Sequence, residues 1–162
     1  MSDTETHPAS VASPMSRAIL AFMALPGLVA YAIPLVIARV TKPAGHFAFA
    51  GLLEIVLGSV VLLWCTREFH VSGHGTLAPW SPPMALARGG LYRWSRNPMY
   101  IGVLLIVIGW ALGFNSGALW AYAGVLLVAF HLRVVFGEEP HLARAFGDEW
   151  KAYRKRVPRW IL

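Results

Sequence analysis

Between Arg96 and Arg133 the chain runs for 36 residues without a Lys, Arg, Asp or Glu. At about 1.5 Å per residue, one continuous helix of that length would far exceed a hydrocarbon core of roughly 30 Å. Gly113, Asn115 and Gly117 cluster in the middle of the run, and such residues are typical of a turn. The run therefore predicts a tight helical hairpin whose arms have about 15–17 residues, the short end for membrane-spanning helices.

Two further apolar runs precede this one. Residues 18–38 carry no charge, and residues 43–66 carry only Glu54. Pro26 and Pro34 interrupt the first run, but proline is tolerated in a spanning helix when neighbouring groups satisfy the freed backbone. The chain is 57% hydrophobic and 14% charged, against about 25% charged in average soluble domains. These features predict an all-α integral membrane protein with about four transmembrane helices.

The basic residues predict the orientation of these helices. With four spans, twelve of the 14 Lys and Arg residues fall on the side of the N-terminus, the 67–97 loop and the tail. Only Arg39 and Lys42 fall on the other side. The positive-inside rule makes the basic side cytoplasmic and places both termini there. The net charge of +6 thus indicates membrane topology and does not indicate nucleic-acid binding.

The N-terminal residues, the single cysteine and the histidines indicate how the rest of the chain is organised. Residues 1–16 are small, polar and acidic, so we expect a disordered start rather than a cleaved leader. Residues 17–162 are expected to form a single membrane-embedded domain. The one cysteine, Cys65, cannot close an internal disulfide, and the Gly73 between His70 and His74 argues against a helical metal-ligand pair. We therefore expect no bound metal.

The segment that opens the long run admits two interpretations. Asn97 suits a helix N-cap and Pro98 the first helical position, which makes the segment a plain helix start at the membrane interface. Alternatively, this helix start together with Arg93 and Arg96 forms an anion site that faces the cytoplasm.

Glu138 and Glu139 follow the last span directly. Acids at a membrane margin are candidates for function, although Glu also favours the start of a helix. After them, apolar residues recur at helical spacing and predict an amphipathic helix that lies in the membrane interface; they are Leu142, Phe146, Trp150, Tyr153 and Val157. Glu54, midway in the second span, is either a substrate or proton site or a neutral acid bonded to a neighbouring helix.

Taken together, several motifs resemble one family. They include Arg-Asn-Pro-Met-Tyr at 96–100, Glu-Glu-Pro-His-Leu at 138–142 and Phe-Gly-Asp-Glu-Trp at 146–150, and the others lie at residues 73–83, 90–93 and 153–160. In order and spacing these resemble the isoprenylcysteine carboxyl methyltransferase family, which is similar in its C-terminal half to phospholipid methyltransferases. The resemblance covers about residues 70–160.

The resemblance implies an integral-membrane enzyme that uses S-adenosylmethionine without a Rossmann domain. Carried over, it makes Glu139 and Arg133 the candidate catalytic residues. Arg96 joins the cofactor site on chemical grounds, because a guanidinium suits the cofactor carboxylate. The full set of candidate cofactor-binding residues is Met84, Ala85, Leu86, Ala87, Tyr92, Arg96, Asn97, Pro98, Met99, Tyr100 and Glu138. Asn97 departs from the family pattern, where many members have His, and it cannot titrate near neutral pH.

The methyl acceptor stays open at this point. A prenylcysteine carboxylate, a phospholipid amine and a small hydrophobic acid or thiol all fit the implied partners, which are lipophilic molecules and membrane lipids. Two other functions are also compatible with the sequence: a sterol-reductase-like membrane reductase that uses NADPH, and a non-catalytic scaffold or transport component.

Overall fold

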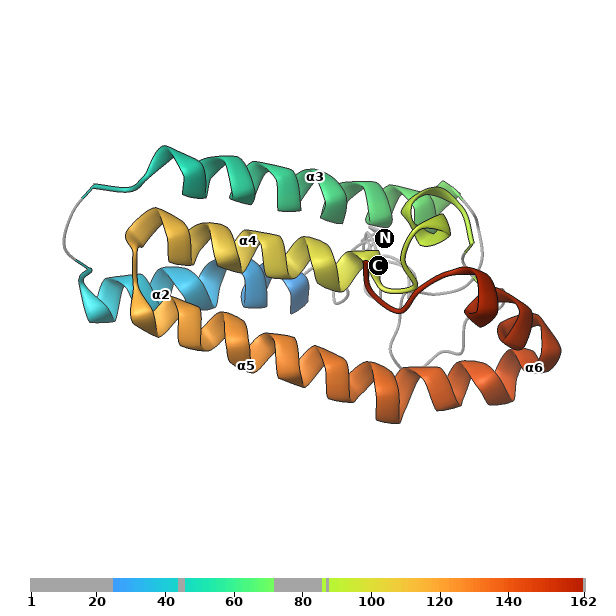
Figure 1. Ribbon diagram of the computed structural model, residues 1–162. Helices are drawn as coiled ribbons and strands as arrows, with labels where there is room; N and C mark the ends of the chain where they lie inside the picture. The colour runs from blue at the N-terminus through green and yellow to red at the C-terminus, as the bar shows by residue number, and fades with distance from the viewer. Residues whose placement is uncertain (1–24, 44–45, 72–85, 87, 162) are drawn as a thin grey trace, which may run out of the picture.

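Prolines and glycines determine where the helices of this protein begin, bend and end. The computed structural model describes residues 25–43, 46–71, 86 and 88–161. Every regular element among them is helical (Figure 1), which confirms the predicted all-α class. The predicted disordered residues 1–16 lie outside the described residues. The elements are η1 (Leu28–Ala32), α2 (Ile33–Thr41), α3 (Phe49–Val71), η2 (Gly90–Arg93), α4 (Pro98–Phe114), α5 (Gly117–Arg133), η3 (Val134–Glu138) and α6 (Glu139–Arg156).

The first helix accommodates a proline by a local π-helical turn. η1 is π-helical, and the N–H of Ile33 bonds the carbonyl of Leu28, five residues back. Pro34 has no N–H to continue this pattern to the next carbonyl, that of Val29. The Tyr122 hydroxyl of α5 donates to that Val29 carbonyl at 2.9 Å. A neighbouring helix thus satisfies a backbone group that the proline leaves without its helical partner.

Two helical stretches are long and apolar enough to cross a bilayer. They are Phe49–Glu68 within α3 and Gly117–Arg156, which comprises α5, η3 and α6. The helices Leu25–Thr41 and Pro98–Phe114 are apolar but shorter. Along α3 the side chains of Leu53, Val60 and Leu63 are each more than half exposed. Apolar side chains on the outer surface of a bundle suit contact with lipid rather than with water.

Glycines bring α3 and α4 into close contact, and this is the most extensive contact between helices in the fold. A Cβ added at Gly58 would lie 2.7 Å from the carbonyl oxygen of Gly102, and one at Gly109 would lie 2.7 Å from that of Gly51. In each helix these two glycines are seven residues apart, so they lie on one face. Small residues of this kind allow helix backbones to approach closely within a membrane.

The chain reverses between α4 and α5 through Asn115 and Ser116. Asn115 has a φ of 46°, the left-handed conformation that Asn tolerates better than most residues. The N–H of Ser116 bonds the carbonyl of Ala111 and that of Asn115 bonds the carbonyl of Leu112, the pattern of a Schellman motif. α4 then lies between α3 and α5 (Figure 1), so its first turn is held from both sides.

The tail differs from the separate interfacial helix that the sequence predicts. α6 continues from α5 through η3, and it is kinked at Gly147, where φ is 47° and ψ is −116°. The apolar stripe is used inside the protein: Trp150, Tyr153 and Val157 are buried, and Leu86 packs against them. The sequence predicts a helix that covers the cytoplasmic end of the bundle and meets lipid headgroups, and the burial of the stripe agrees with the covering role. The periodicity alone does not show that Leu86 packs against this stripe.

The glycine contact leads to a test of the packing. Gly58→Ala and Gly109→Ala are expected to lower the unfolding temperature in detergent, because the added Cβ forces α3 and α4 apart at a cost of about 1–3 kcal/mol. Gly124→Ala is the matched control, since a Cβ there meets nothing within 4 Å and Ala favours a helix over Gly by roughly 0.5–1 kcal/mol. Equal unfolding temperatures for Gly58→Ala and Gly124→Ala would contradict the close contact.

Candidate functional site

Several charged side chains form ion pairs at the end of the bundle where α4 begins and α5 passes into α6. This end lies at the right of Figure 1. The backbone of this region is shaped by two glycines and a proline. Gly90 has a φ of 52°, and both Gly89 and Gly90 lie against the carboxylate of Glu68, where a Cβ would crowd it. Pro98 then opens α4 at its first position, as the sequence predicts.

The π-helical segment η3 brings Arg133 and Glu138 together. Its last residue is Glu138, and the N–H of Glu139 bonds the carbonyl of Val134, five residues back. In a π turn, residues five apart lie nearer to one face of the helix than they do in an α-helix. Arg133 Nε therefore reaches Glu138 Oε1 at 3.0 Å, a pairing that an α-helix would not favour.

Tyr100 joins this pair from α4. Its hydroxyl donates to Glu138 Oε1 at 2.5 Å and accepts from Arg133 Nε at 2.9 Å. The Tyr100 ring lies against Phe130 with centroids 4.5 Å apart. The Arg133 side chain is 61% exposed and that of Glu138 is 35% exposed. This three-residue group, Tyr100–Arg133–Glu138, is therefore accessible to a ligand.

Glu139 lies deeper, between two arginines. Arg96 Nη1 donates to its Oε1 at 2.8 Å, and Arg159 donates to both oxygens, from Nε at 2.7 Å and from Nη2 at 3.0 Å. The side chain of Glu139 is only 12% exposed. Burial raises the pKa of Glu139, but the hydrogen bonds from Arg159 and the charge of Arg96 outweigh it, so the pKa lies below its ordinary value.

Arg96 has donors left over after it binds Glu139. Its side chain is 9% exposed and its guanidinium lies 5.5 Å from the centre of the Trp150 ring. Burial lowers the pKa of Arg96, and the nearby Glu139 carboxylate opposes that shift. Arg96 Nε and Trp150 Nε1 are buried and have no hydrogen-bond partner among the described residues. Two such donors make this point suitable for an anionic group.

Asn97 occupies the N-cap position of α4, but its side chain does not cap the helix. Its Nδ2 instead donates to the backbone carbonyl of Arg159 at 3.0 Å, and its backbone N–H donates to Ser95 Oγ at 3.1 Å. The N-cap interpretation is therefore correct for the position and wrong for the side chain. Asn97 joins the start of α4 to the tail of the chain.

The other predicted cofactor-binding residues lie in different parts of the structure. Tyr92 is buried, and its backbone carbonyl accepts from the Tyr153 hydroxyl at 2.8 Å. Leu86 packs against the buried cluster of Trp150, Tyr153 and Val157, and Met99 packs against the hydrophobic core. Pro98 is buried at the start of α4. Met84, Ala85 and Ala87 lie outside the described residues.

The structure adds Arg159 to the site, a residue that the sequence reasoning did not select. It lies in the motif at 153–160 that supports the family resemblance, so the signal was present in the quoted residues. Its neighbour Trp160 stacks on His131, with ring centroids 6.3 Å apart and Trp160 Nε1 3.4 Å from His131 Nδ1. The tail thus contacts the starts of α4 and α6 and the end of α5.

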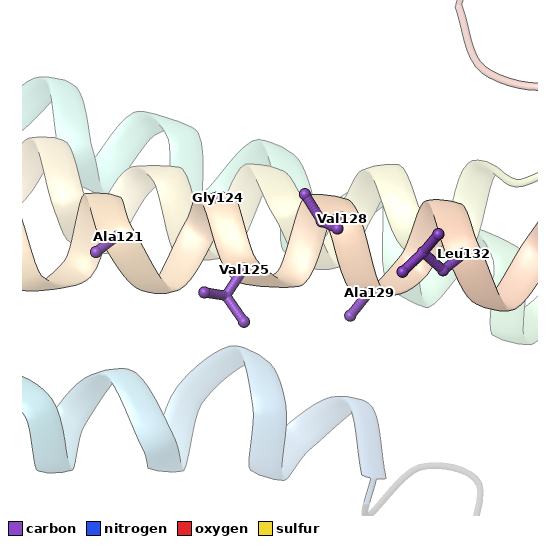
Figure 2. A pocket seen from close by; sticks show the side chains of 6 residues that line it. All are labelled: Ala121, Gly124, Val125, Val128, Ala129 and Leu132. Carbon is purple, nitrogen blue, oxygen red and sulfur yellow. The ribbon is translucent and has the colours of Figure 1, made fainter.

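An apolar groove of about 560 Å³ runs along α5. Figure 2 shows that the lining residues all come from α5 and that Val125 and Ala129 project from the helix on the same side. Leu132, the last lining residue, is followed directly by Arg133. The complete lining is Ala121, Gly124, Val125, Val128, Ala129 and Leu132, none of which has a polar side chain.

Comparison with known proteins identifies a family. The sequence model of the phospholipid methyltransferase family matches residues 47–149. An uncharacterized protein of Haemophilus influenzae is 30% identical over 63 residues, which are 39% of this chain and all of that protein. A protein-S-isoprenylcysteine O-methyltransferase of Schizosaccharomyces pombe is 29% identical over 76 residues, 47% of this chain and 32% of the yeast protein. The chain therefore matches about a third of the yeast protein. No solved structure matches the chain closely enough to count as similar.

The pairing of Glu139 has a consequence for stability against acid. Because its folded pKa lies below the ordinary 4.5, the pairing contributes its full stability above about pH 4.5. That stability is lost as the pH falls through the lower folded pKa. The unfolding temperature of the wild-type chain should therefore fall more steeply below pH 4.5 than that of Glu139→Gln. Asp148→Asn removes a fully exposed ion pair and should leave the wild-type profile almost unchanged. Parallel profiles for the wild-type chain and Glu139→Gln would refute the pairing.

Proposed function

Because the chain belongs to the phospholipid methyltransferase family, we propose that it transfers a methyl group from S-adenosylmethionine to a lipophilic acceptor at the cytoplasmic face of a membrane. The observation that carries the proposal is the charged end of the bundle, where Tyr100, Arg133 and Glu138 form an accessible group beside the Arg96–Glu139–Arg159 cluster. The matched family and the name of the yeast relative support methyl transfer as the reaction class.

The residues present fit the chemistry of this cofactor. Arg96 Nε and Trp150 Nε1, the two buried donors without a described partner, suit its carboxylate. Glu138, which is partly exposed, suits its ammonium or ribose hydroxyls, and the ring of Tyr100 suits its cationic or aromatic parts. S-adenosylmethionine supplies a methyl group on a sulfonium, which an acceptor lone pair attacks as the carbon–sulfur bond breaks and its electron pair stays on sulfur.

For the chain's own residues the task is mainly to hold the two reactants in line and to exclude water. A carboxylate or thiolate acceptor needs no base, whereas an amine must lose a proton. Sequence reasoning made Glu139 a candidate catalytic residue, and its two arginines keep it ionised with a lowered pKa. The more accessible Glu138 is therefore the better placed of the two to receive a proton from an amine acceptor. Arg133, largely exposed next to Glu138, is proposed to orient the polar end of the acceptor.

A lipophilic acceptor suits the apolar surroundings of the site. The groove on α5 consists of apolar side chains and its last lining residue, Leu132, is followed by Arg133. A hydrocarbon chain of the acceptor can lie in such a groove against apolar side chains. The polar end of the acceptor then lies near the charged residues. The acceptors compatible with this are a prenylcysteine-type carboxylate, a phospholipid amine and a small hydrophobic acid or thiol.

The proposal includes four crossings with both termini in the cytoplasm. The two shorter apolar helices, Leu25–Thr41 and Pro98–Phe114, are taken as spans beside Phe49–Glu68 and beside α5 (Gly117–Arg133), the apolar part of the last long helix. The helix α6 then lies on the cytoplasmic side. In this arrangement Arg96, Arg133 and Arg159 share the cytoplasmic side with most of the other basic residues.

Binding of S-adenosylhomocysteine to detergent-purified protein tests the cofactor. Calorimetric titration is expected to show binding of S-adenosylhomocysteine and none of NADPH. Glu138→Gln and Tyr100→Phe are expected to weaken the binding roughly tenfold, since each removes a polar partner at the site. Tyr122→Phe is the matched control, because its hydroxyl bonds the Val29 carbonyl of the first helix. No binding by intact wild-type protein would refute the methyltransferase proposal, and preference for NADPH would favour a reductase.

Cysteine labelling tests the topology. In a Cys65→Ser background, Ala118→Cys places a thiol at the exposed start of α5, and Lys155→Cys places one at the exposed end of α6. A membrane-impermeant maleimide added to intact cells should label position 118 and spare position 155 until the cells are permeabilised. The opposite pattern, or equal labelling of both positions in intact cells, would contradict the proposed orientation.

A further inference from the structure

The closing segment (residues 157–161) lies across the charged end of the bundle and is held at several points. The backbone N–H of Arg96 donates to the Pro158 carbonyl at 2.9 Å. Val157 is buried beside Tyr153, and Trp160 contacts His131. These contacts connect the segment to the start of α4, the end of α5 and the second half of α6.

Arg159 uses both its backbone and its side chain in these contacts. Its carbonyl accepts from Asn97 Nδ2 at 3.0 Å and from Ser95 Oγ at 3.4 Å, while its guanidinium donates to both carboxylate oxygens of Glu139. A continuous series of bonds therefore runs from Asn97 through Arg159 to Glu139. Charge-assisted bonds that engage both carboxylate oxygens fix orientation as well as supply energy.

We propose that Asn97 and Arg159 are positioning residues for cofactor binding: Asn97 anchors Arg159, and Arg159 holds Glu139 in the orientation that keeps Arg96 facing the ligand. The inference rests on the proposed function, because the ligand is the cofactor proposed above. It assigns a role to an asparagine that does not cap its helix and to an arginine outside the residues predicted to bind cofactor.

The hydrogen bonds of Glu139 explain why Arg159 matters. Glu139 Oε2 has Arg159 Nη2 as its donor, and Oε1 is shared between Arg159 and Arg96. Without Arg159 the carboxylate is free to rotate and to engage Arg96 with both oxygens. The Arg96 donors that suit an anionic ligand would then be turned toward Glu139. The guanidinium of Arg159 thus supplies bonds that Arg96 would otherwise have to supply.

The charged groups around Glu139 determine how the loss of Arg159 appears in the pH profile of binding. Arg96, Arg154 and Arg159 act on it with positive charge, and the acidic neighbour Glu138 adjoins it in the chain. Loss of one of the two arginines bonded to Glu139 weakens the preference for its ionised form. The acid limb of cofactor binding should therefore move to higher pH in an Arg159 variant, which a purely structural role of Arg159 does not require.

The experiment measures S-adenosylhomocysteine binding to the full chain in detergent as a function of pH. Arg159→Gln is expected to weaken binding about tenfold at neutral pH and to move the acid limb upward. Arg159→Lys should recover part of both effects, and Asn97→Ala should weaken binding less than Arg159→Gln does. Arg156→Gln is the matched control, since Arg156 is exposed and donates to the Ala152 carbonyl of its own helix, away from Glu139. Unfolding temperatures establish that each variant is folded.

A double variant distinguishes action through Glu139 from an independent contact. If Arg159 acts through Glu139, then Arg159→Gln combined with Glu139→Gln binds no more weakly than Glu139→Gln alone. Additive losses, or an unchanged affinity and acid limb in folded Arg159→Gln, would overturn the positioning role while the wild-type chain still binds. Absence of binding by the wild-type chain would instead overturn the proposed function, and the positioning role with it.

Discussion

The carboxylate of Glu139 accepts hydrogen bonds from Arg96, 43 positions earlier in the chain, and from Arg159, 20 positions later. Through it the start of α4, the start of α6 and the closing segment become one unit. The side chains of Arg96 and Glu139 are each about nine-tenths buried, and the ionised pair is unscreened by solvent compared with a surface pair. The neighbouring group of Tyr100, Arg133 and Glu138 lies on the same helix ends, so the position of these ends also determines its geometry.

Two prolines each follow a π-helical segment. Pro34 follows the π-helical segment η1, and Pro140 follows the π-helical segment η3. In both places the proline lacks an N–H and the π turn is wider than an α turn, so the side chains that follow point in different directions around the helix axis. In the first helix a tyrosine from α5 satisfies the exposed carbonyl. In the second the change of direction aligns Glu138 with Arg133, so an irregularity of the backbone becomes part of the site.

The sequence predicts those features that depend on local chemistry. Pro98 marks the start of α4, the Asn115 turn marks its end, and the long uncharged runs identify the apolar helices. It does not predict the contact of Gly58 with Gly102 or the bond of Asn97 to Arg159, since both join residues far apart in the chain. The same limit explains the tail. The periodicity identifies the apolar stripe, but only the fold shows that Leu86 covers it and that Gly147 bends the helix.

The burial of Arg96 and Glu139 raises the question of why the protein keeps an ion pair at this position. Removing charges from water costs free energy that their mutual attraction often fails to recover, so a buried ion pair is weak grounds for stability. Here Arg96 and Glu139 form a buried pair, Arg159 bonds the same carboxylate, and Arg96 Nε has no described partner although it is buried. A folded chain that bears these costs is better explained by ligand binding than by stability alone. The fold also leaves the donors of Arg96 and Trp150 in place before any ligand arrives, so the ligand need not organise them, and a preformed arrangement lowers the cost of binding.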